Sequence, residues 1–143
     1  MNRAGFQQLA ELRLKEAKAL LAAELPDGAY YLAGYAVECA LKACIAKRTH
    51  EYDFPEKKLV NDSHTHDIKI LLRLAGLSDR LKIDIGRDVI SETSWETIER
   101  WSEQSRYELI EGDDTFRFLE SARMISAVES EKGGVLPWIK QYW

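Results

Sequence analysis

The sequence predicts an all-α protein, an antiparallel bundle of about five helices. Apolar residues recur at the spacing of amphipathic helices, and no strand-like alternation lasts more than a few residues. Only three prolines and eight glycines interrupt the 143 residues, which favours long helices. Residues 29–46, AYYLAGYAVECALKACIA, contain fifteen apolar residues out of eighteen. A helix with so little polar surface has to be enclosed by other helices, which predicts a bundle with this segment near its centre.

The first two helices are expected to form a hairpin. The first runs from about residue 4 to residue 24, with an apolar residue every three or four positions. The turn at residues 26–28, Pro-Asp-Gly, sends the second helix back antiparallel, and that helix is expected to end near Arg48. Residues 49–63 contain Pro55 and no sustained period, which predicts a long loop.

The remaining helices are shorter. A third helix is expected to open between residues 63 and 67 and to stop at Gly76, with three candidate caps, Asp62, Ser63 and Thr65. A turn of helix follows at 78–86, a fourth helix at about 88–104 and a fifth at about 114–131. The residues expected to face inward on the fifth helix are Phe118, Leu119, Ala122, Ile125 and Val128. Residues 1–132 then form the bundle, and 133–143 form an aromatic tail that packs on the body or on a partner subunit.

Charge and cysteine content narrow the class of protein. The net charge is −4, and residues 84–131 carry thirteen acidic and five basic side chains, which argues against broad nucleic-acid coating by that half. A few arginines still suffice to hold a phosphate. Cys39 and Cys44 diverge on one helix, so a disulfide between them is geometrically unfavourable and a reducing cytoplasm is favoured. Glu38 and Lys42 interrupt the apolar segment, which disfavours a membrane span.

Three groups of polar residues are candidates for function. Glu38 and Lys42, four residues apart, form either an ordinary ion pair or a functional one at the edge of the core. The pattern His64-x-His66-Asp67 offers donors to zinc, but a structural zinc site needs four ligands. We therefore favour a role at a helix N-terminus, and expect no metal or cofactor.

Arg106-Tyr107 is the third candidate, at the break before the last helix. Its arginine either bridges two loops or presents a planar fork to a phosphate. No motif for nucleophilic catalysis or for phosphate binding by a glycine-rich loop is present in the sequence.

Three segments carry a family resemblance: YYLAGYAVECALKACI at 30–45, THDIKILLRLAGL at 65–77 and SRY at 105–107. In this order and spacing they resemble the HEPN domain family of bacterial and archaeal proteins, over about residues 5–130. The residues that match the family pattern are Glu38, Lys42, His66, Asp67, Arg106 and Tyr107.

The resemblance implies a four-helix core, a dimer formed through helices and a cleft for nucleotides or RNA. It also implies a minimal nucleotidyltransferase as a partner protein, within a toxin–antitoxin-like module. Family members that cut RNA carry an Arg-x(4–6)-His pattern, which no arginine here provides for His50, His64 or His66. The resemblance therefore favours a binding module without catalysis, and leaves enzymatic activity open.

The leading hypothesis is a cytoplasmic homodimer that binds a nucleotide, RNA or a partner protein. Lys42 and Arg106 contact phosphate, Tyr107 or Tyr31 contacts a base or ribose, and Glu38 orients Lys42. One alternative is a metal-independent ribonuclease toxin that uses His66 for proton transfer and Arg106 for charge stabilisation. Another is a structural or adaptor bundle in which the charged pair only fixes helix register.

Overall fold

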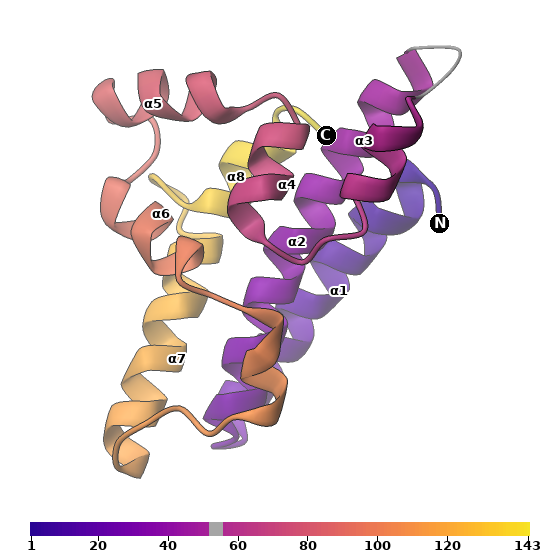
Figure 1. The fold of residues 1–143 in the computed structure, drawn as a ribbon. Coiled ribbons are helices and arrows are strands. Elements are labelled where there is room, and N and C mark those ends of the chain that lie inside the picture. The colour runs from indigo at the N-terminus through magenta and orange to yellow at the C-terminus, as the bar shows by residue number, and fades with distance from the viewer. Residues whose placement is uncertain (52–55) are drawn as a thin grey trace.

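The computed structural model describes residues 1–51 and 56–143, and every regular element within them is helical (Figure 1). The predicted all-α helical fold is confirmed. The elements are α1 (Arg3–Ala22), α2 (Pro26–Glu51), α3 (Lys57–Asp62), α4 (Ile68–Leu74), α5 (Ser78–Gly86), α6 (Glu92–Glu99), the 3-10 helix η1 (Glu103–Tyr107), α7 (Asp114–Glu129) and α8 (Val135–Lys140). None of the helices in the described ranges combines the length and apolar character needed to cross a bilayer.

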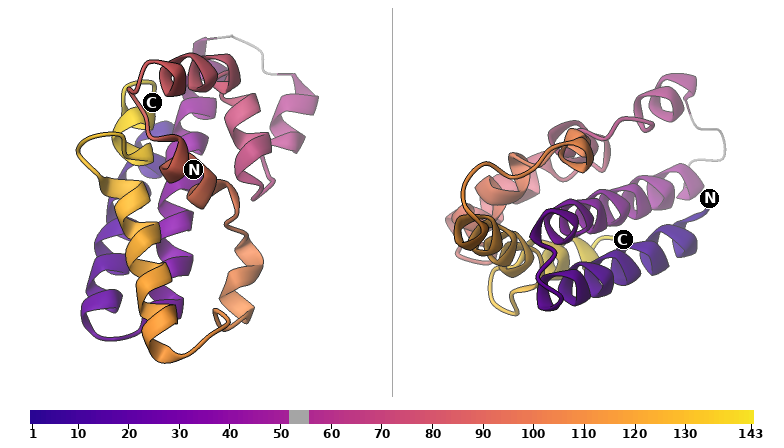
Figure 2. Two further views of the ribbon diagram at one scale, coloured as in Figure 1. Left: turned by 90° about the vertical axis from the view of Figure 1, so that its left-hand side faces the viewer. Right: turned by 90° about the horizontal axis from the view of Figure 1, so that it is seen from below.

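The three longest helices, α1, α2 and α7, make up the body of the bundle. Figure 2 shows α1 and α2 side by side with α7 along them, and α2 also contacts α4, α8 and η1. The Asn2 side chain caps α1 by accepting from the backbone N–H of Gly5. As its sequence predicts, α2 is enclosed by the other helices. Its buried apolar residues include Ala33, Ala36, Val37, Ala40, Leu41 and Ala43.

The two cysteines of α2 are core residues. Both are buried and neither forms a disulfide. Burial raises the pKa of Cys39 to about 11 and the pKa of Cys44 to about 12. At neutral pH both side chains are therefore thiols, which are poor nucleophiles.

The C-terminal residues form a short helix that packs into the core. Trp138 and Ile139 of α8 are buried. The Oδ2 atom of the buried Asp84 accepts from Trp138 Nε1 at 2.9 Å, Arg80 Nε at 3.0 Å and the Tyr142 hydroxyl at 3.3 Å. The Trp138 hydrogen bond is the largest reason why the pKa of this carboxyl lies below its ordinary value. One buried carboxylate thus ties α8 to α5.

Two predictions for the middle of the chain, a loop and a helix cap, are wrong. The segment 49–63 is not one long loop, because α2 continues to Glu51 and α3 occupies Lys57–Asp62; Pro55 lies outside the described residues. The third predicted helix opens at the end of its expected range, but its cap is none of the three candidates: it is Asp67, whose carboxylate accepts from Ile70 N at 3.0 Å.

The predicted fourth helix at 88–104 is also wrong, because the chain forms two separate helices there. Asp88 has a φ of 56°, which is not a helical conformation. Two residues later, Ile90 forms an isolated β-bridge with Gly133. The side chain of Ser91 then caps α6, and that of Ser102 caps η1. Each serine accepts a hydrogen bond from a backbone N–H group in the first turn of a new helix. The two caps therefore allow two short helices to replace one continuous helix.

One expectation about the last long helix is wrong as well. Ile125 and Val128 face the core as predicted, but Phe118 and Leu119 are 40% and 50% exposed. They lie in the first turns of α7, close to the end of the bundle, where no described element covers that side of the helix.

The burial of the two cysteines predicts slow alkylation in the folded protein. With iodoacetamide at neutral pH, we expect little modification of either thiol in native buffer and complete modification of both in urea. Intact-mass spectrometry after a timed reaction measures the number of added groups. Rapid native labelling of Cys39 or Cys44 would contradict the description of α2 as an enclosed helix.

Candidate functional site

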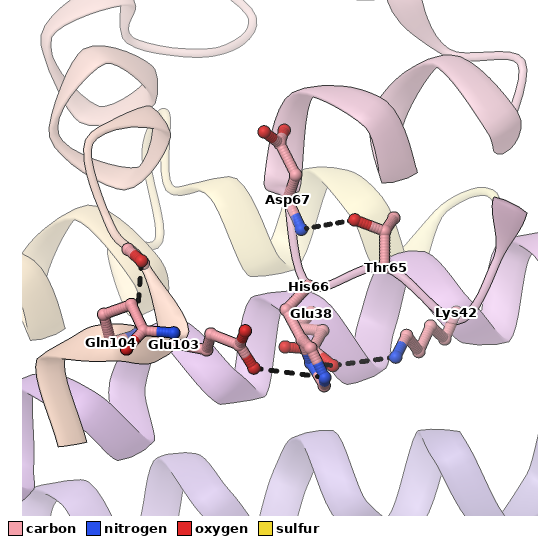
Figure 3. A network of polar contacts seen from close by, with 8 residues as sticks. Glu38, Lys42, Thr65, His66, Asp67, Glu103 and Gln104 are labelled. Atoms are coloured by element: carbon pink, nitrogen blue, oxygen red, sulfur yellow. Dashed lines mark hydrogen bonds and ion pairs between the residues drawn. The ribbon is translucent and has the colours of Figure 1, made fainter. Parts of the chain in front are cut away.

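A network of charged side chains lies where α2, α4 and η1 meet (Figure 3). Glu38 is its buried member, with 1% of its side chain exposed. Its Oε1 atom accepts from Lys42 Nζ at 2.8 Å and lies 2.9 Å from His66 Nδ1. The other ring nitrogen of His66, Nε2, lies 3.2 Å from Glu103 Oε2. The network therefore runs from Lys42 through Glu38 and His66 to Glu103.

Local structure places each member of the network. Glu38 and Lys42 are one turn apart on α2, so their side chains lie on the same face. His66 immediately precedes the Asp67 cap of α4, and the Thr65 hydroxyl accepts from the Asp67 N–H at 3.2 Å, which fixes the turn. Glu103 is the first residue of η1. Three separate segments thus contribute to one site.

The electrostatics of the network depend on the buried carboxylate. A carboxylate removed from water is tolerated when a counter-charge and hydrogen bonds accompany it, and Lys42, with 15% of its side chain exposed, supplies the charge. The second oxygen, Oε2, is buried without a hydrogen-bond partner. A neutral imidazole has only one N–H, so His66 donates to both carboxylates only as the imidazolium.

On the same face of α2, closer to its N-terminus, lies a cluster of aromatic rings. Tyr31 stacks between Tyr35 and Trp101, with ring centroids 6.0 Å apart in each pair. Trp101 reaches α2 at Gly34, where an added Cβ would lie 2.2 Å from the indole ring. Gly34 is therefore required for the approach of Trp101, the residue that leads into η1.

Arg106 and Tyr107 lie at the surface of η1. The guanidinium of Arg106 lies over the Tyr107 ring, 4.7 Å from its centroid, and 73% of Tyr107 is exposed. Partial desolvation lowers the pKa of Arg106, but the neighbouring Tyr31 hydroxyl and the carboxylate of Glu103 contribute to a net rise. These interactions place Arg106 beside Tyr31 and next to the charged network.

The structure thus brings the predicted site residues into two neighbouring groups on one face of α2. Glu38, Lys42 and His66 form the first group, and the second consists of Tyr31, Arg106 and Tyr107. The seventh predicted residue, Asp67, caps α4, and its carboxylate points away from His66 (Figure 3).

The two predicted phosphate contacts are separated along α2. Arg106 lies beside Tyr31, which is eleven residues from Lys42, a separation of roughly 16 Å along a helix axis. Lys42 also borders a hollow formed with α1 and α3, and Arg106 is not among the residues that line it.

Sequence reasoning missed Glu103, Gly34 and Trp101. Glu103 lies three residues before Arg106, and no pattern in the sequence distinguishes it from the other acids of that half. Gly34 interrupts the apolar segment as Glu38 and Lys42 do, but the residue that requires a glycine there, Trp101, lies 67 positions farther along the chain. Among the described residues, no group of three or more histidine, cysteine, aspartate or glutamate side chains is arranged to hold a metal ion.

The helices and the charged network define a small all-α domain with a polar site at the edge of its central helix. The sequence model of the HEPN domain family matches residues 6–132. The chain therefore belongs to the HEPN domain family, and the resemblance in its sequence is confirmed. The match supports a nucleotide- or RNA-related module or a ribonuclease-like relative as the coarse class. No curated protein and no solved structure matches the chain significantly.

The contact between Gly34 and Trp101 predicts that Gly34→Ala destabilises the fold. The added methyl group overlaps the indole, and overpacking of this kind costs about 1–3 kcal/mol. Gly86→Ala is the matched control, because a Cβ at Gly86 meets nothing within 4 Å. Urea unfolding followed by circular dichroism measures both variants. If Gly34→Ala were as stable as Gly86→Ala, the close approach of Trp101 to α2 would be wrong.

Proposed function

We propose that this HEPN domain binds a short stretch of RNA at η1 and the adjoining face of α2, and does not cleave it. The Arg106–Tyr107 pair carries the proposal. Tyr107 is largely exposed, with the Arg106 guanidinium on one face of its ring. An exposed ring is a platform for a nucleobase, and a guanidinium binds phosphate through two parallel hydrogen bonds.

Lys42 and Tyr31 extend the proposed binding surface along α2. One N–H of the Lys42 ammonium bonds Glu38, which orients the lysine and leaves two further donors. The distance along α2 between Lys42 and Tyr31, the residue beside Arg106, is longer than a single nucleotide. This spacing favours a strand of two or more nucleotides over a single mononucleotide as the ligand.

The contacts of His66 favour binding without catalysis. Proton transfer to or from a ribose needs a ring nitrogen within reach of the substrate. Here both ring nitrogens of His66 face carboxylates, Glu38 on one side and Glu103 on the other. His66 in this arrangement holds η1 to α2 and has no nitrogen directed at a ligand.

A ribonuclease is the second candidate function, and one contact favours it. A buried carboxylate that holds Nδ1 of a histidine is a common way to orient the ring for proton transfer, and Glu38 does this for His66. The His66 side chain is 42% exposed. If Glu103 moved away, Nε2 would be available to a substrate.

Family membership supports two further proposals about partners. We propose that the domain forms a homodimer and that it acts with a nucleotidyltransferase partner in a toxin–antitoxin-like module. Co-expression with the protein of the neighbouring reading frame and size-exclusion chromatography with light scattering test both. A monomer that does not co-purify with such a partner would remove these two proposals without affecting RNA binding.

The RNA-binding proposal predicts that Arg106→Ala weakens binding by about 10- to 100-fold, because a hydrogen-bonded charged contact contributes roughly 1.5–3 kcal/mol. Fluorescence anisotropy with a labelled eight-nucleotide RNA measures the Kd, with ATP as a competitor. Tyr107→Ala should also weaken binding. Arg123→Ala is the matched control, since Arg123 is an exposed arginine on α7 that pairs with Glu120. Equal losses in Arg106→Ala and Arg123→Ala would indicate only a general charge effect.

The absence of catalysis is tested directly. We expect purified protein to leave a labelled RNA intact over hours without added metal, and expression to leave growth unaffected. Electrophoresis of the RNA and growth curves provide the measurements, with His66→Ala as the comparison. RNA cleavage that disappears in His66→Ala would overturn the non-catalytic proposal in favour of the ribonuclease.

A further inference from the structure

Five large apolar side chains are exposed at one end of the bundle. This end surface consists of Leu25, Leu109, Phe116, Phe118 and Leu119, which are 55%, 73%, 46%, 40% and 50% exposed, respectively. They come from the α1–α2 turn, the segment after η1 and the first turns of α7, which lie at the same end of the molecule in Figure 1. Large apolar side chains that gather at one end of a molecule and stay exposed indicate an interaction site.

The end surface contains two hollows. Leu25, Phe118 and Leu119 border a hollow of about 670 Å³ between the α1–α2 turn and α7. Leu109 and Phe116 border a second one, of about 620 Å³. Such hollows accept apolar side chains from a partner.

Asp27 holds the three segments of the end surface together. Its Oδ1 atom accepts from the backbone N–H of Ile110 at 3.0 Å, and Arg117 of α7 forms an ion pair with the same carboxylate. The Ser121 hydroxyl of α7 also donates to the backbone carbonyl of Pro26. The apolar side chains therefore project from a fixed framework, which lowers the entropic cost of binding.

The apolar character is confined to one part of α7. Leu119 lies on the outer side of its first turns, opposite the buried Met124 and Val128, and the exposed Phe116 and Phe118 lie on the two flanks of the helix beside it. Farther along the same outer side, α7 presents polar residues. The helix is therefore amphipathic over its second half and apolar on the outside only at the end surface.

The rim of the end surface is acidic. Residues 24–28 and 106–120 together contain seven acidic and two basic side chains, and one further basic residue, Arg100, lines the second hollow. One of the two basic residues, Arg117, is paired with Asp27 and Asp114. Glu24, Glu108 and Glu111 have no ion pair within the described part of the chain.

We propose that the end surface docks a basic segment of another protein, one that presents apolar side chains flanked by lysine or arginine. The apolar side chains fill the two hollows, and the cations face the acidic rim. A second copy of this chain fits less well, because two acidic rims would face each other across a symmetric interface. RNA is disfavoured for the same electrostatic reason. The proposal goes beyond RNA binding and does not depend on it.

The test uses a defined probe, a labelled fourteen-residue peptide of alternating leucine and lysine blocks, with an equivalent leucine–glutamate peptide as its counterpart. We expect fluorescence anisotropy to show saturable binding of the basic peptide and none of the acidic one. Leu119→Ser and Phe118→Ser should each weaken binding about tenfold. Leu12→Ser is the matched control, because Leu12 is an exposed leucine on α1 that lies outside the end surface. Circular dichroism checks that each variant folds.

A second variant tests the charge. Glu108→Gln combined with Glu111→Gln should weaken binding of the basic peptide and reduce its dependence on salt. Unchanged binding in this variant, or equal losses in Leu119→Ser and Leu12→Ser, would overturn the proposal. A homodimer that dissociates on Leu119→Ser, or an RNA affinity that falls with it, would assign the end surface to a second copy or to RNA and would likewise overturn it.

Discussion

The buried carboxylate of Glu38 is the constraint on which the arrangement of the site depends. A carboxylate at 1% exposure in the middle of an apolar helix is stable only with its partners in place. Removing one partner of a buried pair typically costs about 3–5 kcal/mol, whereas an apolar replacement of the whole group is often neutral. The contribution of Glu38 is therefore to the uniqueness of the structure and not to its net stability. It fixes the position of His66, and through His66 the position of Glu103.

The buried Glu38 carboxylate and the packing of Trp101 on Gly34 both fix the position of η1. Glu103 is the first residue of η1, and Trp101 precedes η1 by two positions. Both are held against α2, one through the His66 imidazole and the other through direct packing on a glycine. The exposed Arg106–Tyr107 pair is thus carried by an element with two anchors, which favours a preformed binding surface over one that orders on contact.

Sequence periodicity predicted the helical class and the enclosed second helix, because burial requires an apolar circumference. The spacing of Glu38 and Lys42 likewise predicted their pairing, since that is a local property of a helix. The division into α6 and η1 was not predicted, because single serine caps decide it. Glu103 could not be predicted, because its role arises only from its contact with His66. Phe118 was predicted to face inward because periodicity identifies the apolar face of a helix but does not show whether another element covers that face.

The two proposed surfaces lie close together and differ in charge, which limits how ligands can occupy them. Arg106 lies beside Tyr31, and Lys42 lies eleven residues farther along α2. Glu108 and Glu111 follow Arg106 in the chain and line the second hollow of the end surface. Phosphates are repelled by the rim, so in the proposed complex the RNA strand extends from Arg106 toward Lys42. A basic partner on the end surface would neutralise the rim, and thereby strengthen binding of the phosphates nearest to Arg106. The two ligands would then bind with positive coupling, transmitted through charge alone and without a change in the fold.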